Sequence, residues 1–588
     1  MISSSTWVPR GYASEFPEKY ELDDEEMERI SAMAKLELSD AKKGLKLAQE
    51  SEQGEQSESE GEDEEDGDNS NGNKKGFKDQ IDVDDDLKEY DLENYDNDED
   101  SEGEEVTMFP GLSNSDVKFH ADNGEDPYLT LPTEIDDQEE KKEFQIYPTD
   151  NLVLATRTED EVSYLDVYIY DDGAGAPNGE EEPEDMLDDD VAKGMVRDSN
   201  LYVHHDIMLP AFPLCVEWVN YKPNQSSIEE GDMNIGNFAA IGTFDPQIEI
   251  WNLDCIDKAF PDLILGEPEQ NSFSAIKKNK KKKKKKSATH ITTHHTDAVL
   301  SLTHNKIHRS VLASTSADQT VKLWDLNSGN AVRSFNSIHG KKTVSSSQWH
   351  SQEASILLTG GYDGTVGITD VRIADESNMT KNYNIGNGEE VENVSWGHPS
   401  APEIFYAGTD GGNIYCFDIR NEAKPLWTLH AHDSGISSLA INSYIPGMLM
   451  TSAMGEKVVK LWKCPLDSQK GPSMVLSRDF DVGNVLTTAF ANDMEVGGCL
   501  TVGGASGALK MWDTFSNRAV ANAFRPELKQ LQKEARELAK QQGRASRIAR
   551  KYQNDNSVEN VMVPESNDVD ESEDDEEEGD NIEEEEED

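Results

Sequence analysis

Three features of this sequence predict an all-β fold, a propeller of seven similar blades with acidic extensions at both ends. First, a strand–turn–strand pattern recurs in seven copies along the middle of the 588 residues. Second, each copy ends in an aromatic residue or its equivalent, and the spacing approaches the length of one propeller blade. Third, the acidic residues that give the chain its formal net charge of −65 gather largely outside these copies. The copies therefore predict the packed domain, and the acidic tracts predict its solvated extensions.

Each copy combines a short apolar strand, a turn of small or acidic residues, and a second, alternating strand. In the copy from Val311 to Asp325, apolar and polar residues alternate before the closing Trp324. The closing position falls at Tyr170, Trp251, Trp324, Thr369, Phe417, Trp462 and Trp512. The last five are 45, 48, 45 and 50 residues apart, which is typical of WD repeats. We therefore expect a seven-bladed WD-repeat β-propeller over residues 141–525, with insertions at 173–198 and 257–290.

One copy carries four polar residues at the spacing of a structural tetrad, namely His295, Ser314, Asp318 and Trp324. Hydrogen bonds from indole to hydroxyl, hydroxyl to imidazole and imidazole to carboxylate would satisfy buried polar groups within a blade. Other copies are degenerate; one keeps His432, Ser452 and Trp462 but places Glu456 in the turn. We interpret the tetrad as structural and not as a Ser-His-Asp catalytic triad.

The sequence lacks the motifs of common catalytic and metal sites. It contains no phosphate-binding loop, no metalloprotease helix, no hydrolase serine motif and no calcium-binding loop. The five cysteines are scattered without a CxxC pair, which argues against a zinc finger and a disulfide framework. We expect no enzymatic activity, no cofactor, no bound metal and no small-molecule substrate. No apolar run reaches the length of a membrane span, so we expect no membrane partner.

Acidic residues dominate two tracts that cannot form a packed core. Residues 50–105 hold 26 acids against four lysines, and residues 568–588 hold 16 acids and no base. We expect a disordered acidic tract at 50–105 within an N-terminal extension, 1–140, and a disordered acidic tail at 556–588. The simpler interpretation is that these tracts keep the protein soluble. The more specific interpretation is that they mask a basic protein. Four serines in acidic surroundings are candidates for phosphorylation: Ser57, Ser59, Ser101 and Ser572.

Basic residues gather at two places. The run at 277–286 holds nine lysines that repel one another and must be exposed: Lys277, Lys278, Lys280, Lys281, Lys282, Lys283, Lys284, Lys285 and Lys286. A basic helix is expected at 526–555, with a narrow apolar stripe of Leu528, Leu531, Ala535 and Leu538. Its predicted end carries Arg544, Arg547, Arg550 and Lys551. Both groups are candidates for RNA binding or nuclear import; the alternatives are a solvated loop and a helix packed on its own propeller.

The first residues suggest a segment that docks a partner. Aromatic residues recur at Trp7, Tyr12, Phe16 and Tyr20. A helix predicted at about 22–48 then carries an apolar stripe that begins with Met27 and Ile30. Because this helix lies far in sequence from any blade, it has no core of its own to join. We therefore expect the segment to order on a partner protein.

Four stretches resemble a known family. They are Trp7–Tyr20, beginning Trp-Val-Pro-Arg-Gly-Tyr; Thr243–Asp254; Thr292–Val299; and Ser546–Tyr552, with Ser-Arg-Ile-Ala-Arg-Lys-Tyr. Together they are similar to the periodic tryptophan protein 1 family, in its fungal form. The resemblance implies a nucleolar WD-repeat protein that helps to assemble the large ribosomal subunit. It also implies that the protein works without catalysis on pre-ribosomal RNA, together with assembly factors and possible contacts to ribosomal proteins.

Two functional classes remain open at this stage. In the first, the propeller is a nuclear and nucleolar scaffold for large-subunit assembly, whose basic elements contact ribosomal RNA. In the second, it is a chromatin protein whose acidic arms escort histones. The lysine run and the basic helix favour the first, because histones are themselves basic.

Overall fold

The computed structural model describes the propeller and its immediate attachments. The described residues are 1–20, 142, 144–173, 199–224, 234–266, 290–386, 388–421, 424–465, 471–541, 546–549, 551–552 and 561–564. They belong to one compact unit. Several sequence predictions lie outside these residues: the helix at 22–48 with Met27 and Ile30, the acidic tract, the four serines, the lysine run, Arg544, Arg550 and nearly all of the acidic tail.

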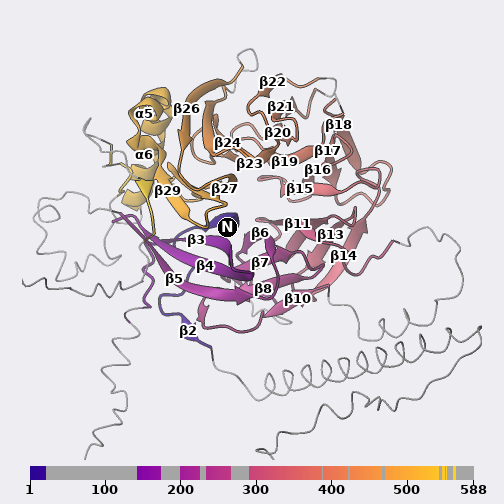
Figure 1. Cartoon of the computed structure of the whole chain (residues 1–588), viewed down its shortest axis with the longest axis horizontal. Coiled ribbons are helices and arrows are strands. Elements are labelled where there is room, and N and C mark those ends of the chain that lie inside the picture. The colour runs from indigo at the N-terminus through magenta and orange to yellow at the C-terminus, as the bar shows by residue number, and fades with distance from the viewer. Residues whose placement is uncertain are drawn as a thin grey trace, which may run out of the picture. The chain divides into compact units, whose positions relative to one another are not determined.

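Seven four-stranded antiparallel sheets stand around a ring (Figure 1), which confirms the seven-bladed propeller. Blade one contains β1 (Ile2–Val8), β3 (Asn151–Glu159), β4 (Val162–Asp171) and β5 (Asn200–Leu209). Blade two contains β6 (Pro213–Val219), β7 (Phe238–Thr243), β8 (Ile248–Asn252) and β10 (Leu263–Leu265). Blade three contains β11 (Val299–His304), β12 (Val311–Ser316), β13 (Val321–Asp325) and β14 (Asn330–Phe335).

The remaining blades keep the same order along the chain. Blade four contains β15 (Val344–Trp349), β16 (Ile356–Gly361), β17 (Thr365–Asp370) and β18 (Thr380–Asn384). Blade five contains β19 (Val391–Trp396), β20 (Ile404–Thr409), β21 (Asn413–Asp418) and β22 (Trp427–His430). Blade six contains β23 (Ile436–Ile441), β24 (Met448–Ala453), β25 (Val458–Lys463) and β26 (Ser473–Asp479). Blade seven contains β27 (Val485–Phe490), β28 (Cys499–Gly504), β29 (Leu509–Asp513) and β30 (Val561–Met562).

The N-terminal strand belongs to the propeller, which corrects the predicted start at residue 141. Strand β1 pairs antiparallel with β3, with Trp7 opposite Val153. It contacts β6 of blade two and β27 of blade seven as well. A further short strand, β2 (Glu18–Lys19), runs parallel to β9 (Cys255–Ile256). The first 20 residues therefore supply the fourth strand of blade one, because the described chain after residue 141 contributes only three strands to that blade.

The C-terminal part also departs from the prediction. A 3₁₀ turn (Thr514–Ser516) leads into α5 (Arg518–Ala523) and α6 (Arg525–Gln541). Helix α6 ends well before residue 555. Residues 546–549 are not helical, and Ser546 Oγ and the Ile548 backbone N–H instead donate to Glu495 of blade seven. Strand β30, within the predicted disordered tail, pairs with β29 and completes blade seven.

Helix α6 packs on blade seven through a stripe that differs by one position from the predicted one. Its buried side chains are Leu528, Leu531, Ala535 and Ala539. Leu538, assigned to the stripe from the sequence, is 41% exposed. The stripe joins a core cluster that contains Trp512 and Phe515. No helix among the described residues has the length and apolar character needed to cross a membrane.

Candidate functional site

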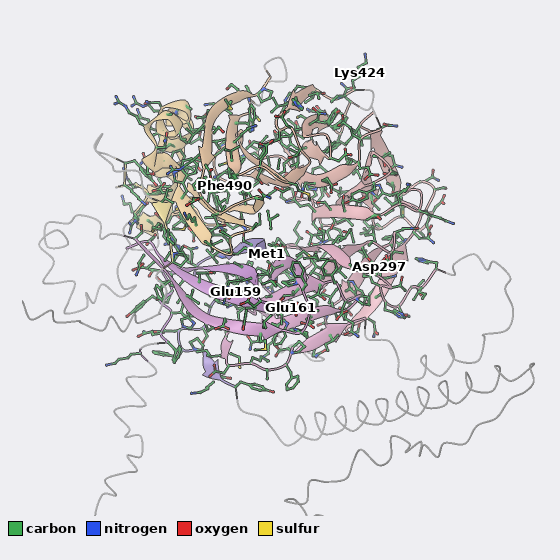
Figure 2. The ribbon with its side chains drawn as sticks, in the orientation of Figure 1. Met1, Glu159, Glu161, Asp297, Lys424 and Phe490 are labelled. Carbon is green, nitrogen blue, oxygen red and sulfur yellow. The ribbon has the colours of Figure 1, made fainter. Side chains whose placement is uncertain are left out.

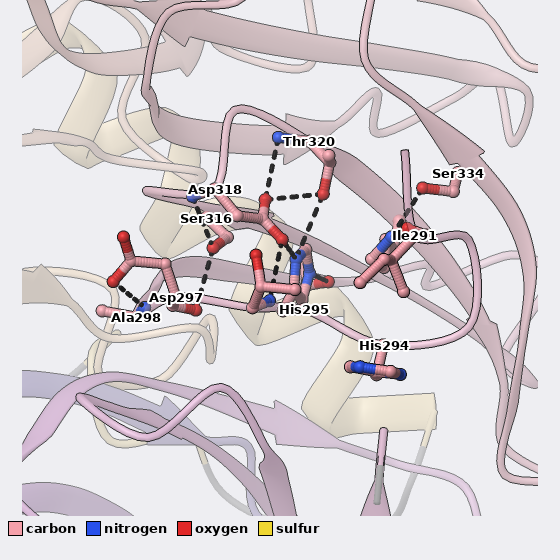
Figure 3. Close-up of polar contacts among 12 residues, drawn as sticks. Ile291, His294, His295, Asp297, Ala298, Ser316, Asp318, Thr320 and Ser334 are labelled. Carbon is pink, nitrogen blue, oxygen red and sulfur yellow. Dashed lines mark hydrogen bonds and ion pairs between the residues drawn. The ribbon is translucent and has the colours of Figure 1, made fainter. Parts of the chain in front are cut away.

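The four polar residues of blade three form a continuous hydrogen-bonded chain. The Trp324 indole donates to Ser314 Oγ at 2.8 Å, and Ser314 Oγ lies 2.7 Å from His295 Nε2. His295 Nδ1 lies 2.9 Å from Asp318 Oδ2, and Thr320 completes the group by donating to Asp318 Oδ1 at 2.6 Å (Figure 3). His295 and Ser314 are fully buried. The tetrad therefore joins the turn and the strands of a single blade.

The charges of this group suit a structural role. Burial lowers the pKa of His295, so that its imidazole is neutral at physiological pH. Asp318 is held ionised, since its hydrogen bonds to His295 and Thr320 outweigh burial and lower its pKa. Because both imidazole nitrogens and the serine hydroxyl are engaged inside the blade, no nucleophile is presented to a substrate.

Two other blades repeat parts of the tetrad. In blade four, His339 contacts Asp363 at 3.0 Å and Thr359 at 2.9 Å. In blade six the hydroxyl comes from Thr451, which lies 2.9 Å from both His432 Nε2 and the Trp462 indole nitrogen. The sequence analysis assigned that role to Ser452. The turn between the two strands is one residue longer in blade six than in blade three. Thr451 pairs with Lys460, nine residues later, whereas Ser314 pairs with Lys322, eight residues later. The hydroxyl that faces the tryptophan therefore lies one position earlier in blade six.

Blade two contains a buried contact that sequence reasoning missed. The Trp251 indole donates to Glu249 Oε2 at 3.1 Å, because Ile241 opposite Glu249 offers no hydroxyl. Glu249 is 8% exposed. Burial raises the pKa of this carboxyl to about 7. The alternation of Ile248, Glu249 and Ile250 in the sequence gave only a weak signal of this contact.

The N-terminal aromatic residues do not form one docking surface. Trp7 is 1% exposed, and its indole donates to Ala489 O at 3.1 Å. Tyr12 packs edge-on against Trp218, with ring centroids 4.8 Å apart. These two were predicted to bind a partner. Both instead pack within the propeller, because β1 places Trp7 in blade one and the turn that follows β1 places Tyr12 against β6 of blade two. Phe16 is 48% exposed, and Tyr20 lies 5.8 Å from Lys258 Nζ; their docking role stays a prediction.

Arg10 links the first residues to two blades; it lies in the stretch Trp7–Tyr20 that resembles a known family, but the sequence analysis assigned it no role. Its Nη2 donates to Asp172 Oδ2 at 3.1 Å and to Asn151 Oδ1 at 3.0 Å. Its Nε donates to Asp493 Oδ2 at 2.6 Å. The Arg10 side chain is only 8% exposed. Asp172 follows a strand of blade one and Asp493 follows a strand of blade seven, so this arginine bridges the ends of the ring.

Two of the four basic residues predicted at the end of the helix, Arg547 and Lys551, pack against blade seven, which argues against RNA binding by these two. Arg544 and Arg550 lie outside the described residues, so their assignment stays a prediction. Arg547 is 6% exposed. Lys551 Nζ lies 2.7 Å from Asp513 Oδ2, and the Tyr552 hydroxyl donates to the same carboxylate at 2.6 Å. Ser546 donates to Glu495 Oε2 at 2.9 Å. The fully buried Asp513 supplies the reason, because a buried carboxylate needs cationic and hydrogen-bonding partners.

Exposed bases occur instead along α6 itself. Arg525, Lys529, Lys533, Arg536 and Lys540 are all exposed, and blue-tipped side chains project outward from the α5–α6 pair in Figure 2. Their spacings of four, four, three and four residues were visible in the sequence as a helical signal. The sequence analysis predicted a basic helix over 526–555 but named only the later bases as RNA-binding candidates.

The part of the chain that the structure describes contains no candidate metal site. No group of three or more histidine, cysteine or acidic side chains there is arranged to hold an ion. The five cysteines are free thiols, four of them buried.

Comparison with known proteins gives a consistent result. The family model "WD domain, G-beta repeat" matches residues 286–325. Periodic tryptophan protein 1 of Saccharomyces cerevisiae is 58% identical, over 97% of this chain and 98% of the relative. An uncharacterised WD repeat-containing protein of Schizosaccharomyces pombe is 38% identical, over 89% of this chain and 91% of the relative. The periodic tryptophan protein 1 homolog of Drosophila melanogaster is 32% identical, over 78% and 83%.

Proposed function

This chain is a fungal-type member of the periodic tryptophan protein 1 family, and from that premise we propose that it is a non-catalytic scaffold for maturation of the large ribosomal subunit. It supports pre-rRNA processing by binding pre-ribosomal RNA and other assembly factors. It acts in the nucleus, chiefly in the nucleolus. The lysine run at 277–286 directs nuclear import or binds RNA, and the helix at 22–48 docks a protein partner.

The observation that best supports this proposal is the presence of two strongly basic segments in a chain that is otherwise acidic. A chain of net charge −65 carries nine lysines in one short run and an exposed row of bases on α6. Phosphate groups are the ligands that such bases bind most strongly, because each neutralised phosphate releases a counterion. A scaffold role is supported by the hydrogen bonds of the tetrad side chains, because these bonds hold the side chains within the blades.

The alternative is a chromatin protein that escorts histones. It is favoured by the acidic tracts at 50–105 and 568–588, which complement basic proteins. The exposed bases of α6 disfavour it, since histones would be repelled there.

Purification of the tagged full-length protein from cells separates the two proposals. We expect large-subunit pre-rRNA to be enriched over small-subunit pre-rRNA, with no enrichment of core histones. Recovery of histones without pre-rRNA would support the alternative. Recovery of neither would overturn both. A deletion of residues 277–286 serves as a second arm, and it should reduce nucleolar accumulation while leaving the melting temperature unchanged.

A further inference from the structure

The exposed surface of α6 is divided by charge into two flanks. Successive residues of a helix are rotated by about 100°. Between Arg525 and Gln541, only five residues fall in the arc of about 80° that begins at Arg525, and all five are basic. They are Arg525, Lys529, Lys533, Arg536 and Lys540, and we call them the basic stripe. The three acidic residues, Glu527, Glu534 and Glu537, lie outside this arc, and Glu537 Oε1 lies 4.0 Å from Lys533 Nζ at the edge of the stripe.

The basic stripe is a straight and fixed row of charges. Its 16 residues of helix, 525–540, span about 22 Å. Leu528, Leu531 and Ala535 are buried on another face of the helix, about 120° around the axis from the centre of the stripe. The first turn is held to blade six by Lys463, whose Nζ lies 2.7 Å from Glu527 Oε1. The middle is held by Gln532, which donates to Ile548 O at 2.9 Å. A ligand therefore meets charges whose backbone positions are already set, which lowers the entropic cost of binding.

We propose that the basic stripe binds the phosphate backbone of RNA. Backbone contacts need cations in a row and carry no base specificity, which matches a stripe of arginines and lysines. A protein partner would need an apolar or aromatic anchor at the centre of the contact, and the stripe contains none. Arg536 donates one bond to Ala549 O at 3.4 Å and keeps further N–H donors for a phosphate. The inference rests on the proposed function only for the statement that the RNA is pre-ribosomal.

Charge reversal within the stripe, with a matched reversal elsewhere, tests this proposal. The test variant is Lys529→Glu, Lys533→Glu and Lys540→Glu in the full-length chain. The control is Lys342→Glu, Lys424→Glu and Lys457→Glu, three exposed lysines on blades four, five and six; Lys424 stands at the rim away from α6 (Figure 2). Both variants have the same net charge. Both should melt as the wild type does, because every altered side chain is exposed.

Binding of a labelled single-stranded RNA long enough to span the helix is measured by fluorescence anisotropy over a salt series. We expect the test variant to bind more weakly and the plot of log affinity against log salt to flatten by about two units, from three contacts at roughly 0.7 each. The control should keep the wild-type slope. An unchanged slope in the test variant, or an equal loss in the control, would overturn the proposal. So would intact RNA binding together with loss of an acidic protein from purified complexes.

The same variants in cells separate this inference from the proposed function. If wild type recovers large-subunit pre-rRNA and the test variant recovers as much, the stripe is not the contact and the function stands. If wild type recovers no pre-rRNA but the stripe governs RNA binding in solution, the function fails and the inference stands.

Discussion

Arg10 Nε donates to Asp493 Oδ2 at 2.6 Å, across a sequence separation of 483 residues. The same guanidinium also donates to Asp172. A propeller must join its last blade to its first, and here one buried arginine bridges the two. Arginine suits this place because its planar fork donates to two carboxylates at once.

Replacing Arg10 by methionine should destabilise the protein strongly. Asp172, whose side chain is 1% exposed, and Asp493 would both lose the Arg10 guanidinium, and breaking a buried pair in this way costs about 3–5 kcal/mol. The free energy of unfolding from urea denaturation measures the loss. Arg372→Met is the matched control, because Arg372 pairs with Asp370 while 70% exposed, and it should leave the midpoint nearly unchanged. Equal midpoints for the two variants would contradict the bridge.

Trp7→Ala should also lower stability, by about 3–5 kcal/mol, because a large buried side chain leaves a cavity. Trp7 packs edge-on against Tyr170, with ring centroids 6.0 Å apart, and donates to Ala489 O. Phe16→Ala, at a 48% exposed aromatic of the same segment, should change the melting temperature little. If Phe16→Ala were the more damaging of the two, the placement of β1 in blade one would be wrong.

Trp324 allows packing and hydrogen bonding to be separated in blade three. Trp324→Ala should cost about 3–5 kcal/mol. Trp324→Phe keeps an aromatic ring and loses the indole donor to Ser314, so we expect a loss nearer 1 kcal/mol for that hydrogen bond. Denaturation of both variants, with Phe244→Ala as a 60% exposed control, provides the measurement. A larger loss for phenylalanine than for alanine would show that the ring is not accommodated.

Glu249 should give the protein a pH-dependent stability. Burial raises its pKa from 4.5 to about 7, so the folded state binds this proton more tightly than the unfolded state does. The stabilisation that it provides is complete below about pH 4.5 and is lost as the pH rises through about 7. Glu249→Gln, which still accepts from Trp251, should remove this component.

The stability difference between wild type and Glu249→Gln is therefore the quantity to follow. Measured at about pH 5 and about pH 8, it should shift in favour of the variant at the higher pH. A difference that is the same at both pH values would mean that Glu249 titrates as it does in the unfolded chain.

The repeating part of this protein can be predicted from its amino-acid sequence alone. Strand alternation, turn residues and a fixed period predict the seven blades. The same signals predict the tetrad of His295, Ser314, Asp318 and Trp324. They are sufficient because each of them acts within one repeat. Where a single turn changed length, as between Thr451 and Lys460, the same local pattern assigned the wrong hydroxyl.

The closure of the ring and the roles of its two ends depend on contacts between residues far apart in the sequence. Trp7 and Arg10 find their partners on β strands and loops hundreds of residues away, and no local pattern specifies which distant edge a lone strand will pair with. In the same way Arg547 and Lys551 look like surface bases in the sequence, yet the buried carboxylate of Asp513 draws the segment that carries them onto blade seven. Charge patterns reveal which residues can meet a phosphate, but burial decides which of them are free to do so, because a base engaged in the core is unavailable to a ligand.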